Sequence, residues 1–261
     1  MQSKAFKPLV SVIVNCHNGE KYLSKSIKSI LSQTYKNFEI VFFDNMSNDK
    51  SKIIIKRFKD KRIKYFKSKK FLNLYEARNK AISKAKGKYI CFCDYDDWWM
   101  KNKLMKQLNY LKKNKKVNFI FSNLNIYNEK TKKSFLYFKK MPSGNITQAL
   151  LNDYKIGIGS VFMNKKLFKN DKFNNKYNII GDFDFFLNLS LKEKLYCIQK
   201  PLAFYRHHDS NFSKKTEIFA KEMDHWMNKN FNKFKKLNYS LKRFKFNYYK
   251  LKLKQLISRG L

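Results

Sequence analysis

The chain of 261 residues has no long hydrophobic run. No uninterrupted apolar stretch approaches the roughly 20 residues that a membrane-spanning helix needs, and Met1 to Pro8 has no apolar core of the kind that a signal peptide carries. We therefore expect a soluble, cytoplasmic protein. Hydrophobic residues make up 43% of the sequence, which suffices for a substantial core and excludes a disordered tail.

Cysteine, glycine and proline are also scarce. The four cysteines, Cys16, Cys91, Cys93 and Cys197, show neither paired C-x-x-C spacing nor the density of a disulfide scaffold, so we expect buried thiols. Seven glycines and three prolines leave no obvious flexible linker and no early glycine-rich phosphate loop. The lack of that loop argues against a nucleotidyltransferase.

Acidic residues are few beside basic ones. The 19 Asp and Glu against 58 Lys and Arg give a net charge of +39, and such a field attracts nucleic acid or an anionic membrane surface. Lysine is spread over the whole length instead of one stripe, so we interpret the excess partly as compositional drift and partly as a preference for anionic surfaces. We expect no nucleic-acid partner, although a nucleic-acid-binding protein stays an alternative.

Three of these scarce acids stand within four residues. Asp94, Asp96 and Asp97 directly follow the apolar run 89–93. Carboxylates held this close repel one another unless a cation lies among them, and hard oxygen ligands suit Mg²⁺ or Mn²⁺. The cluster predicts a metal site at the end of a strand. The alternative is a solvated turn that caps a helix beginning near Lys101.

Strand and helix patterns alternate in the first half of the chain. This alternation predicts an α/β fold with a mostly parallel central sheet and helices on both faces. Polar residues follow the first, second and fourth strands, at the edge where such sheets collect ligands, so three polar clusters should converge on one crevice. The predicted strands are 9–14, 38–43, 63–66 and 89–93, and the predicted helices are 23–31, 53–58 and 74–85.

The second half loses this regularity. After an amphipathic helix over 104–111, strand-like runs indicate α+β character, and from about Lys214 the chain becomes a basic helical region. The strand-like runs are 119–121, 134–138 and 160–163.

Several short motifs follow one another in a fixed order: 10–14 with Asn18, 29–35, 38–41 with Asp44, 77–79, and 87–90 leading into 94–98. Together they resemble family 2 glycosyltransferases, which use the GT-A fold, from about Pro8 to Ser213. The resemblance implies a catalytic domain over 1–213, with a nucleotide-sugar-binding half at about 8–122 and an acceptor-side half at about 123–213. A basic helical C-terminal extension would occupy 214–261.

The resemblance assigns roles to the acids and to one arginine. Asp44 would accept a hydrogen bond from the nucleotide base, although an Asp before Asn45 also suits a turn. Arg78 would face the diphosphate, with a surface salt bridge as its alternative. Asp94 would contact the ribose.

The metal ligands would be Asp96 and His208, for a Mn²⁺ or Mg²⁺ that neutralises the departing diphosphate. Asp97 would be a further ligand or a support behind the ligands. Arg206 would neutralise phosphate charge or pair with a core carboxylate. We assign the neighbouring His207 a structural role.

The segment 180–186 resembles the one that supplies the catalytic base of inverting members. Asp182 is the matching position, whereas Gly181 stands where many members have Glu. A carboxylate there would deprotonate the acceptor hydroxyl, although Asp182 would also suit a helix cap. Asp184 lies roughly 200° further around a helix and faces elsewhere.

Three residues after the first strand, Asn15, His17 and Asn18, would lie around the base and ribose. Asn15 and His17 depart from the Pro and Tyr that relatives frequently have, and Asn45 replaces a frequent second Asp. These departures leave the nucleotide open, and UDP is the first expectation.

We therefore expect a metal-dependent, inverting glycosyltransferase of the hexosyltransferase type. It would move a sugar from a nucleotide-sugar donor, most commonly a UDP-sugar, to a glycan or lipid-linked acceptor, with 154–160 near the acceptor. A relative that binds nucleotide sugars without transferring them stays an alternative.

The basic tail would hold the enzyme at the inner face of an anionic membrane. Its alternative is a helical appendage packed on the catalytic domain or against a second subunit. The aromatic residues expected at the membrane are Trp226, Phe231, Phe234, Tyr248 and Tyr249.

Overall fold

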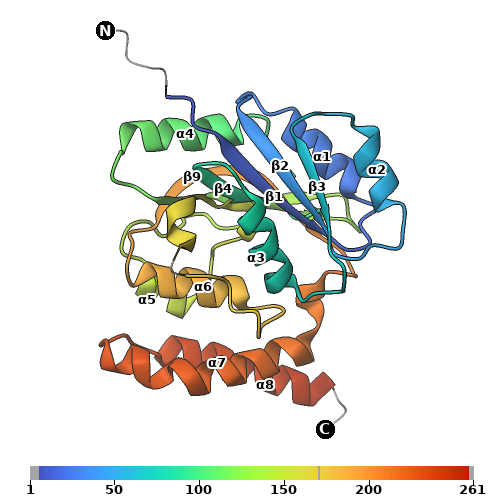
Figure 1. The fold of residues 1–261 in the computed structure, drawn as a ribbon. Coiled ribbons are helices and arrows are strands. Elements are labelled where there is room, and N and C mark those ends of the chain that lie inside the picture. The colour runs from blue at the N-terminus through green and yellow to red at the C-terminus, as the bar shows by residue number, and fades with distance from the viewer. Residues whose placement is uncertain (1–5, 170, 259–261) are drawn as a thin grey trace.

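A computed structural model describes residues 6–169 and 171–258. Within them a nine-stranded sheet is covered by helices on both faces (Figure 1). The predicted spans 1–213 and 214–261 include residues 1–5, 170 and 259–261, which lie outside the described residues. None of the described helices combines the length and the apolar content that a bilayer span requires.

The elements of the chain have the following bounds. The strands are β1 Val10–Cys16, β2 Phe38–Asp44, β3 Ile63–Lys67, β4 Tyr89–Phe92, β5 Trp98–Trp99, β6 Phe119–Asn128, β7 Ser134–Leu136, β8 Phe162–Asn164 and β9 Tyr196–His207. The α-helices are α1 Leu23–Leu31, α2 Ser51–Arg57, α3 Leu74–Lys84, α4 Lys103–Lys113, α5 Thr147–Asn152, α6 Gly181–Ser190, α7 Thr216–Lys236 and α8 Lys242–Ser258. The 3₁₀ turns are η1 Ile158–Ser160, η2 Lys165–Phe168 and η3 Phe212–Lys214.

The sheet is mostly parallel, as predicted. Its order is β3-β2-β1-β4-β8-β6-β9-β5, with β7 paired to β6. The long pairings of β1 with β2 and of β6 with β9 are parallel, whereas the antiparallel pairings join two or three residues each. All seven residues of β1 are buried because the strand has a neighbour on each side and helices on each face.

Alternate residues of β1 serve two cores on opposite faces of the sheet. Ile13 packs in the layer that includes α3, α5 and α6, whereas Val12 and Val14 pack in the layer of α1, α2 and α4. All four cysteines are free and buried, which confirms that expectation.

Two strands lie where the sequence predicts none. β9 is twelve residues long, but Pro201 interrupts its pattern, and its pairing with β6 shifts register between Ser122 and Leu124. β5 has only two residues and pairs with β9. The predicted strand-like run 160–163 is partly η1 and partly β8.

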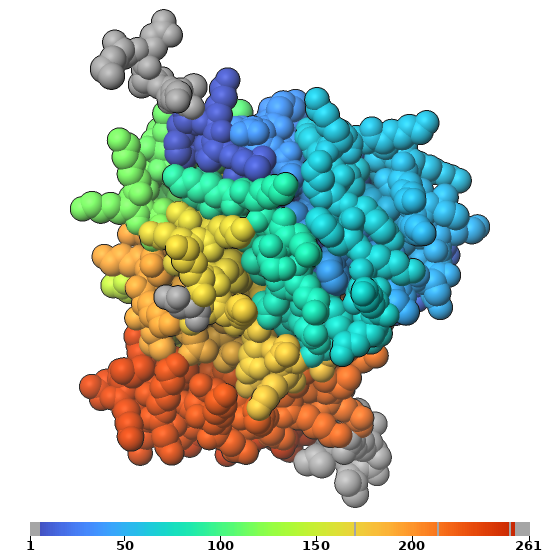
Figure 2. Space-filling view, in the orientation of Figure 1, coloured from blue at the N-terminus to red at the C-terminus, as the bar shows by residue number. Residues whose placement is uncertain are grey.

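The two C-terminal helices lie along one edge of the molecule, beneath α5 and α6 (Figures 1 and 2). Trp226 and Phe234 of α7 are 0% exposed and belong to the same hydrophobic cluster as Phe183 of α6. The prediction that Trp226 and Phe234 contact a membrane is therefore wrong, because both rings are used in packing α7 onto the domain. The predicted division at residue 213 stays a prediction.

Truncation of Trp226 should destabilise the whole domain. Its ring contacts Phe183 and Phe244, and its Nε1 donates to Asp184 at 2.9 Å. We expect Trp226→Ala to lower the free energy of unfolding by about 3–5 kcal/mol in a urea titration. Phe135→Ala removes a ring that is 56% exposed and should cost less than about 0.5 kcal/mol. Equal losses would contradict a packed α7.

Candidate active site

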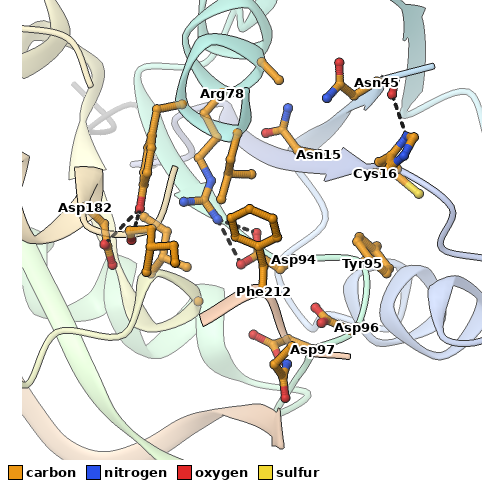
Figure 3. A pocket seen from close by; sticks show the side chains of 18 of the residues that line it. Asn15, Cys16, Asn45, Arg78, Asp94, Tyr95, Asp96, Asp97, Asp182 and Phe212 are labelled. Carbon is orange, nitrogen blue, oxygen red and sulfur yellow. Dashed lines mark hydrogen bonds and ion pairs between the residues drawn. The ribbon is translucent and has the colours of Figure 1, made fainter. Parts of the chain in front are cut away.

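A cavity of about 450 Å³ lies at the carboxyl ends of β1, β2 and β4 (Figure 3). Polar residues from the ends of all three strands line it, namely Asn15 and His17, Asn45, and Asp94, Asp96 and Asp97, so the predicted convergence on one crevice is confirmed. Seven of the eleven predicted site residues line the cavity. They are Asn15, His17, Arg78, Asp94, Asp96, Asp97 and Asp182, whereas Asn18, Asp44, Arg206 and His208 do not.

Arg78 of α3 and Asp94 form an ion pair in this cavity (Figure 3). One guanidinium nitrogen lies 2.7 and 2.9 Å from the two carboxylate oxygens. The Arg78 side chain is 3% exposed and that of Asp94 29%. Burial lowers the pKa of Arg78, but Asp94, together with Tyr75 and Asp182, holds that pKa above its ordinary value. Arg78 therefore forms a salt bridge, as in the alternative interpretation, but its guanidinium is buried instead of lying at the surface.

Asp97 is buried behind the other acids. Its Oδ1 accepts a hydrogen bond from the backbone N–H of Arg206 at 2.8 Å. Burial raises the pKa of Asp97 well above its ordinary value, and the neighbouring carboxylates Asp96 and Asp94 raise it further. Asp97 therefore ties the acidic segment to β9 and offers one carboxylate oxygen toward the cavity.

Arg206 holds the same segment from behind. Its Nε donates to the backbone carbonyl of Asp96 at 2.8 Å. Its guanidinium lies 4.6, 4.7 and 5.5 Å from the ring centroids of Tyr22, Trp98 and Tyr127, which is cation–π distance. Arg206 thus fixes the loop from outside the cavity.

Asp96 faces His208 across a short polar contact. Nε2 of His208 lies 3.0 Å from Oδ2 of Asp96 and 3.1 Å from Nδ2 of Asn211. Nδ2 of Asn211 also donates to the Arg206 carbonyl, and Nδ1 of His208 lies 2.8 Å from the Ser210 hydroxyl. If Asn211 donates to Nε2, the two facing atoms of His208 and Asp96 are both acceptors and need a proton or a cation between them.

The pair Asp96 and His208 fits a divalent cation that also binds a ligand. Among residues 6–169 and 171–258, no three His, Cys, Asp or Glu side chains are arranged to hold a metal ion. Mg²⁺ in phosphate sites is nevertheless bound by one or two protein ligands, with phosphates and water completing its coordination. A carboxylate oxygen and an imidazole nitrogen 3.0 Å apart beside an open cavity can supply such a pair of ligands.

Asp182 lies in the first turn of α6, across the cavity from Asp96 (Figure 3). Its carboxylate accepts hydrogen bonds from the hydroxyls of Tyr75 at 3.0 Å and Tyr154 at 3.3 Å, and from the Phe183 N–H at 2.9 Å. Burial raises the pKa of Asp182, while Arg78 and these donors oppose the shift. The group is an oriented carboxylate with raised basicity.

The structure explains why residue 181 is a glycine and where the side chain of Asp184 is directed. The Tyr75 ring packs against Gly181 so closely that a Cβ there would lie 2.5 Å from a ring carbon, which leaves no room for the Glu of many relatives. Asp184 turns away, as predicted, and accepts a hydrogen bond from Trp226.

The other end of the cavity is partly apolar and carries two aromatic rings. Nδ1 of His17 lies 2.9 Å from the carbonyl oxygen of Asn45, and its ring meets Phe71 edge to face at 4.8 Å. Phe71 is 62% exposed. Nδ2 of Asn15 is buried without a hydrogen-bond partner and is a donor available to a ligand.

Asn18 and Asp44 lie outside the lining. Asn18 has a φ of 54°, and its side chain accepts from Asn48 N–H at 3.0 Å. Asp44 is 0% exposed and accepts hydrogen bonds from the Tyr65 hydroxyl at 2.6 Å and from Ser47 N–H at 2.8 Å. The second bond is the turn contact of the alternative interpretation, and both nucleotide roles stay predictions.

A buried lysine positions the wall beside Asp97. Lys103 is 0% exposed and donates to Gln107 at 2.7 Å and to the Val161 carbonyl at 3.4 Å. Gln107 donates in turn to the Ser160 carbonyl at 2.8 Å. Burial lowers the pKa of Lys103 to about 8. These contacts hold the segment 157–160, part of which lines the cavity.

Sequence analysis misses several of these residues. Tyr75 stands three positions before Arg78, hence on the same face of α3, and this spacing is a usable signal. The spacing of Lys103 and Gln107, four residues apart, is another. Tyr154 belongs to the segment 154–160 that we expect near the acceptor, but its bond to Asp182 is not predicted. Nothing local points to Phe71, which lies far in sequence from its partner His17.

Comparison with known proteins shows the family. Residues 11–180 match the family described as Glycosyl transferase family 2. An uncharacterized glycosyltransferase of Methanocaldococcus jannaschii, MJ1057, is 34% identical over 241 residues, which cover 85% of this chain and 81% of the relative. The chain belongs to glycosyltransferase family 2 and is an enzyme of that type.

Two further proteins are similar to this one. The Escherichia coli protein described as UDP-Glc:alpha-D-GlcNAc-diphosphoundecaprenol beta-1,3-glucosyltransferase WfaP is 34% identical over 184 residues, covering 70% of this chain and 71% of WfaP. The mannosyltransferase PcManGT from Pyrobaculum calidifontis, solved with GDP-Man and Mn²⁺, superposes with a TM-score of 0.65 at 13% identity and covers 87% of this chain and 65% of that one. The second likeness confirms the GT-A fold.

Removal of the Asp94 charge should destabilise the fold, because the buried guanidinium of Arg78 would lose its partner. We expect Asp94→Asn to lower the free energy of unfolding by about 3 kcal/mol, because Arg78 keeps its charge without a partner. Asp60→Asn is the matched control, since the ion pair of Asp60 with Arg62 is about one quarter exposed on both sides and is worth about 0.2–1 kcal/mol. Similar losses in the two variants, measured by urea titration, would contradict the importance of burial.

Proposed function

We propose that this enzyme transfers a sugar from a UDP-sugar to a hydroxyl of a glycan or lipid-linked acceptor, with metal assistance and inversion at the anomeric carbon. The observation that carries the proposal is the separation of acidic groups within one cavity. Asp96 lies on one side, Asp182 on the other, and the Arg78–Asp94 pair lies between them (Figure 3). His208 contacts Asp96 from outside the lining of the cavity. The reaction needs a cation beside the leaving diphosphate, where negative charge develops. It also needs a base beside the acceptor hydroxyl, which loses a proton, so the two groups must stand apart.

On the donor side, Asp96 and His208 would hold the cation. A bound Mn²⁺ or Mg²⁺ supplies electrostatic stabilisation of the leaving diphosphate. The complex of PcManGT with GDP-Man and Mn²⁺ supports this choice. Asp97 offers its second oxygen as a further ligand or supports the loop. Arg206 keeps the loop in place.

On the acceptor side, Asp182 acts as the general base. The acceptor oxygen attacks the anomeric carbon, the bond from that carbon to the diphosphate oxygen breaks, and the acceptor proton passes to the Asp182 carboxylate. The Tyr75 and Tyr154 hydroxyls orient that carboxylate before the acceptor arrives. Attack from the side opposite the leaving group gives inversion.

The nucleotide would occupy the end formed by Asn15, His17 and Phe71. The unpaired Nδ2 of Asn15 would donate to it, and the two rings would contact the base. Asn18 and Asp44 would support this pocket from behind through the turn after β2. The name of WfaP, which specifies UDP-Glc, favours UDP.

The acceptor would enter along 157–159, opposite the donor. The diphosphoundecaprenol in the name of WfaP supports a lipid-linked acceptor, and such an acceptor places the enzyme at the cytoplasmic face of a membrane. Family membership favours transfer over nucleic-acid binding. An inactive relative would bind the nucleotide sugar and release no product.

Asp182→Asn should abolish chemistry without loss of donor binding. We expect kcat to fall by about 10²–10⁴-fold, whereas the Kd for UDP with Mn²⁺ stays unchanged in calorimetry. Asp184→Asn is the matched control in the same helix turn, since Asp184 faces Trp226 instead of the cavity. Transfer that survives in Asp182→Asn would remove Asp182 from the reaction.

The pH profile should report the raised pKa of Asp182. The base must be ionised, so kcat/KM should fall as the pH falls through a pKa above the ordinary Asp value of 3.8. The free energy of unfolding should change in the opposite direction to kcat/KM. Because the pKa of Asp182 is raised in the folded state, ionisation of Asp182 lowers the stability of the fold as the pH rises. Asp182→Asn should therefore not destabilise the fold at neutral pH, and an acid limb at the ordinary Asp value would contradict this account.

Two adjacent histidines provide a test of the metal site. His208→Ala should weaken Mn²⁺-dependent UDP binding by roughly tenfold or more, because it removes a ligand. His207→Ala is the matched control, since His207 is exposed and should leave binding unchanged. Calorimetric titration of UDP with and without Mn²⁺ measures both. Equal affinities in the two variants would exclude His208 as a ligand.

A further inference from the structure

The last helix, α8, has two different faces. Leu241 and Phe244, just before and within its first turn, are buried, and Tyr248 and Lys252 on the same face bond to Asp224 of α7. These contacts fasten α8 to α7 and leave the opposite side of the helix facing outward.

That outward side carries an apolar stripe, which we call the α8 stripe: Phe246, Tyr249 and Leu253. Their exposed fractions are 57%, 59% and 59%. At 100° per residue they lie within roughly 60° of one another and roughly 140° from the inner face. Large apolar side chains aligned in this way on one helix are not scattered surface residues.

The charged residues of α8 are all basic. Residues 242–258 contain six Lys and Arg and no Asp or Glu. Lys242, Arg243 and Lys250 are exposed and fall within roughly 90° of the stripe on the helical wheel. An apolar strip flanked by long cationic side chains is the pattern of a helix that lies in the headgroup region of an anionic bilayer.

We propose that the α8 stripe is the surface by which this enzyme docks on anionic lipid. A second copy of the chain fits the stripe less well, because a two-fold contact would set two basic faces against each other. The proposal replaces Trp226 and Phe234, which are buried, with residues that can reach a membrane.

The docking surface is rigidly connected to the active site. Glu222 of α7 accepts hydrogen bonds from three successive backbone N–H groups, those of Asn178, Ile179 and Ile180, at 2.5, 2.9 and 3.1 Å. Asn178 and Ile179 line the cavity, and the segment leads directly into Asp182. A helix pair held on lipid would therefore hold the catalytic base at a fixed height above it, where a lipid-linked acceptor presents its sugar. This purpose rests on the proposed function, whereas lipid binding itself does not.

The test is sedimentation of the full chain with phosphatidylcholine vesicles, with and without phosphatidylglycerol. The variant carries Phe246→Ser, Tyr249→Ser and Leu253→Ser, and we expect its partitioning onto phosphatidylglycerol vesicles to fall at least about tenfold. The matched control carries Phe135→Ser and Leu136→Ser, an exposed apolar pair on β7 near Lys132 and Lys133. It should bind like the parent.

Each outcome has one meaning. Failure of the parent to bind phosphatidylglycerol vesicles, or equal binding by the stripe variant, would overturn the proposal, the latter because unspecific lysine attraction would then suffice. A parent dimer that the stripe variant converts to monomer, without any change in vesicle binding, would assign the stripe to a second copy instead. Titration of UDP into the same proteins separates the two proposals. If the parent binds vesicles but not UDP, the proposed enzyme function is wrong and the docking surface stands. If it binds UDP but not vesicles, the docking surface is wrong and the enzyme function stands.

Discussion

The site depends on how a very basic chain neutralises four carboxylates in one cavity. Asp94 is compensated by Arg78. Asp97 is buried, has a raised pKa and accepts a backbone N–H of β9. Among the residues that the structure describes, Asp96 pairs with no Lys or Arg and faces His208, while Asp182 accepts hydrogen bonds from neutral hydroxyls. Asp94 and Asp97 shape the cavity, whereas under the proposed function Asp96 would serve a metal and Asp182 would accept the acceptor proton.

Contacts between segments that are remote in sequence hold these acidic residues in place. β9 ends beside the acidic loop, so Arg206 fastens that loop with its backbone and its side chain. α3 supplies both Arg78, which pairs with Asp94, and Tyr75, which bonds to Asp182, from one face and so links the two ends of the cavity. α7 holds the entry to α6 through Glu222. Changes in these supports are therefore expected to affect catalysis without any contact to substrate.

Sequence alone predicts what local pattern encodes. The apolar runs before Asp44 and Asp94 identify buried strands, and the rule that ligands gather at their carboxyl ends places the polar clusters correctly. It does not predict which remote side chains meet. Tyr154 reaches Asp182 across 28 positions. The helical periodicity around Trp226 identifies an apolar face but not whether protein or lipid covers it, and the structure shows that protein does.

The central claim is that Asp96 and His208 bind the metal and Asp182 stands apart from it. Anomalous X-ray diffraction at the manganese edge, from crystals grown with UDP and Mn²⁺, tests it most directly. The account predicts one peak bound by the Asp96 carboxylate, His208 Nε2 and the diphosphate, with Asp182 on the open side of the cavity. Bound diphosphate with the peak at Asp182, or with manganese held by neither Asp96 nor His208, would contradict it.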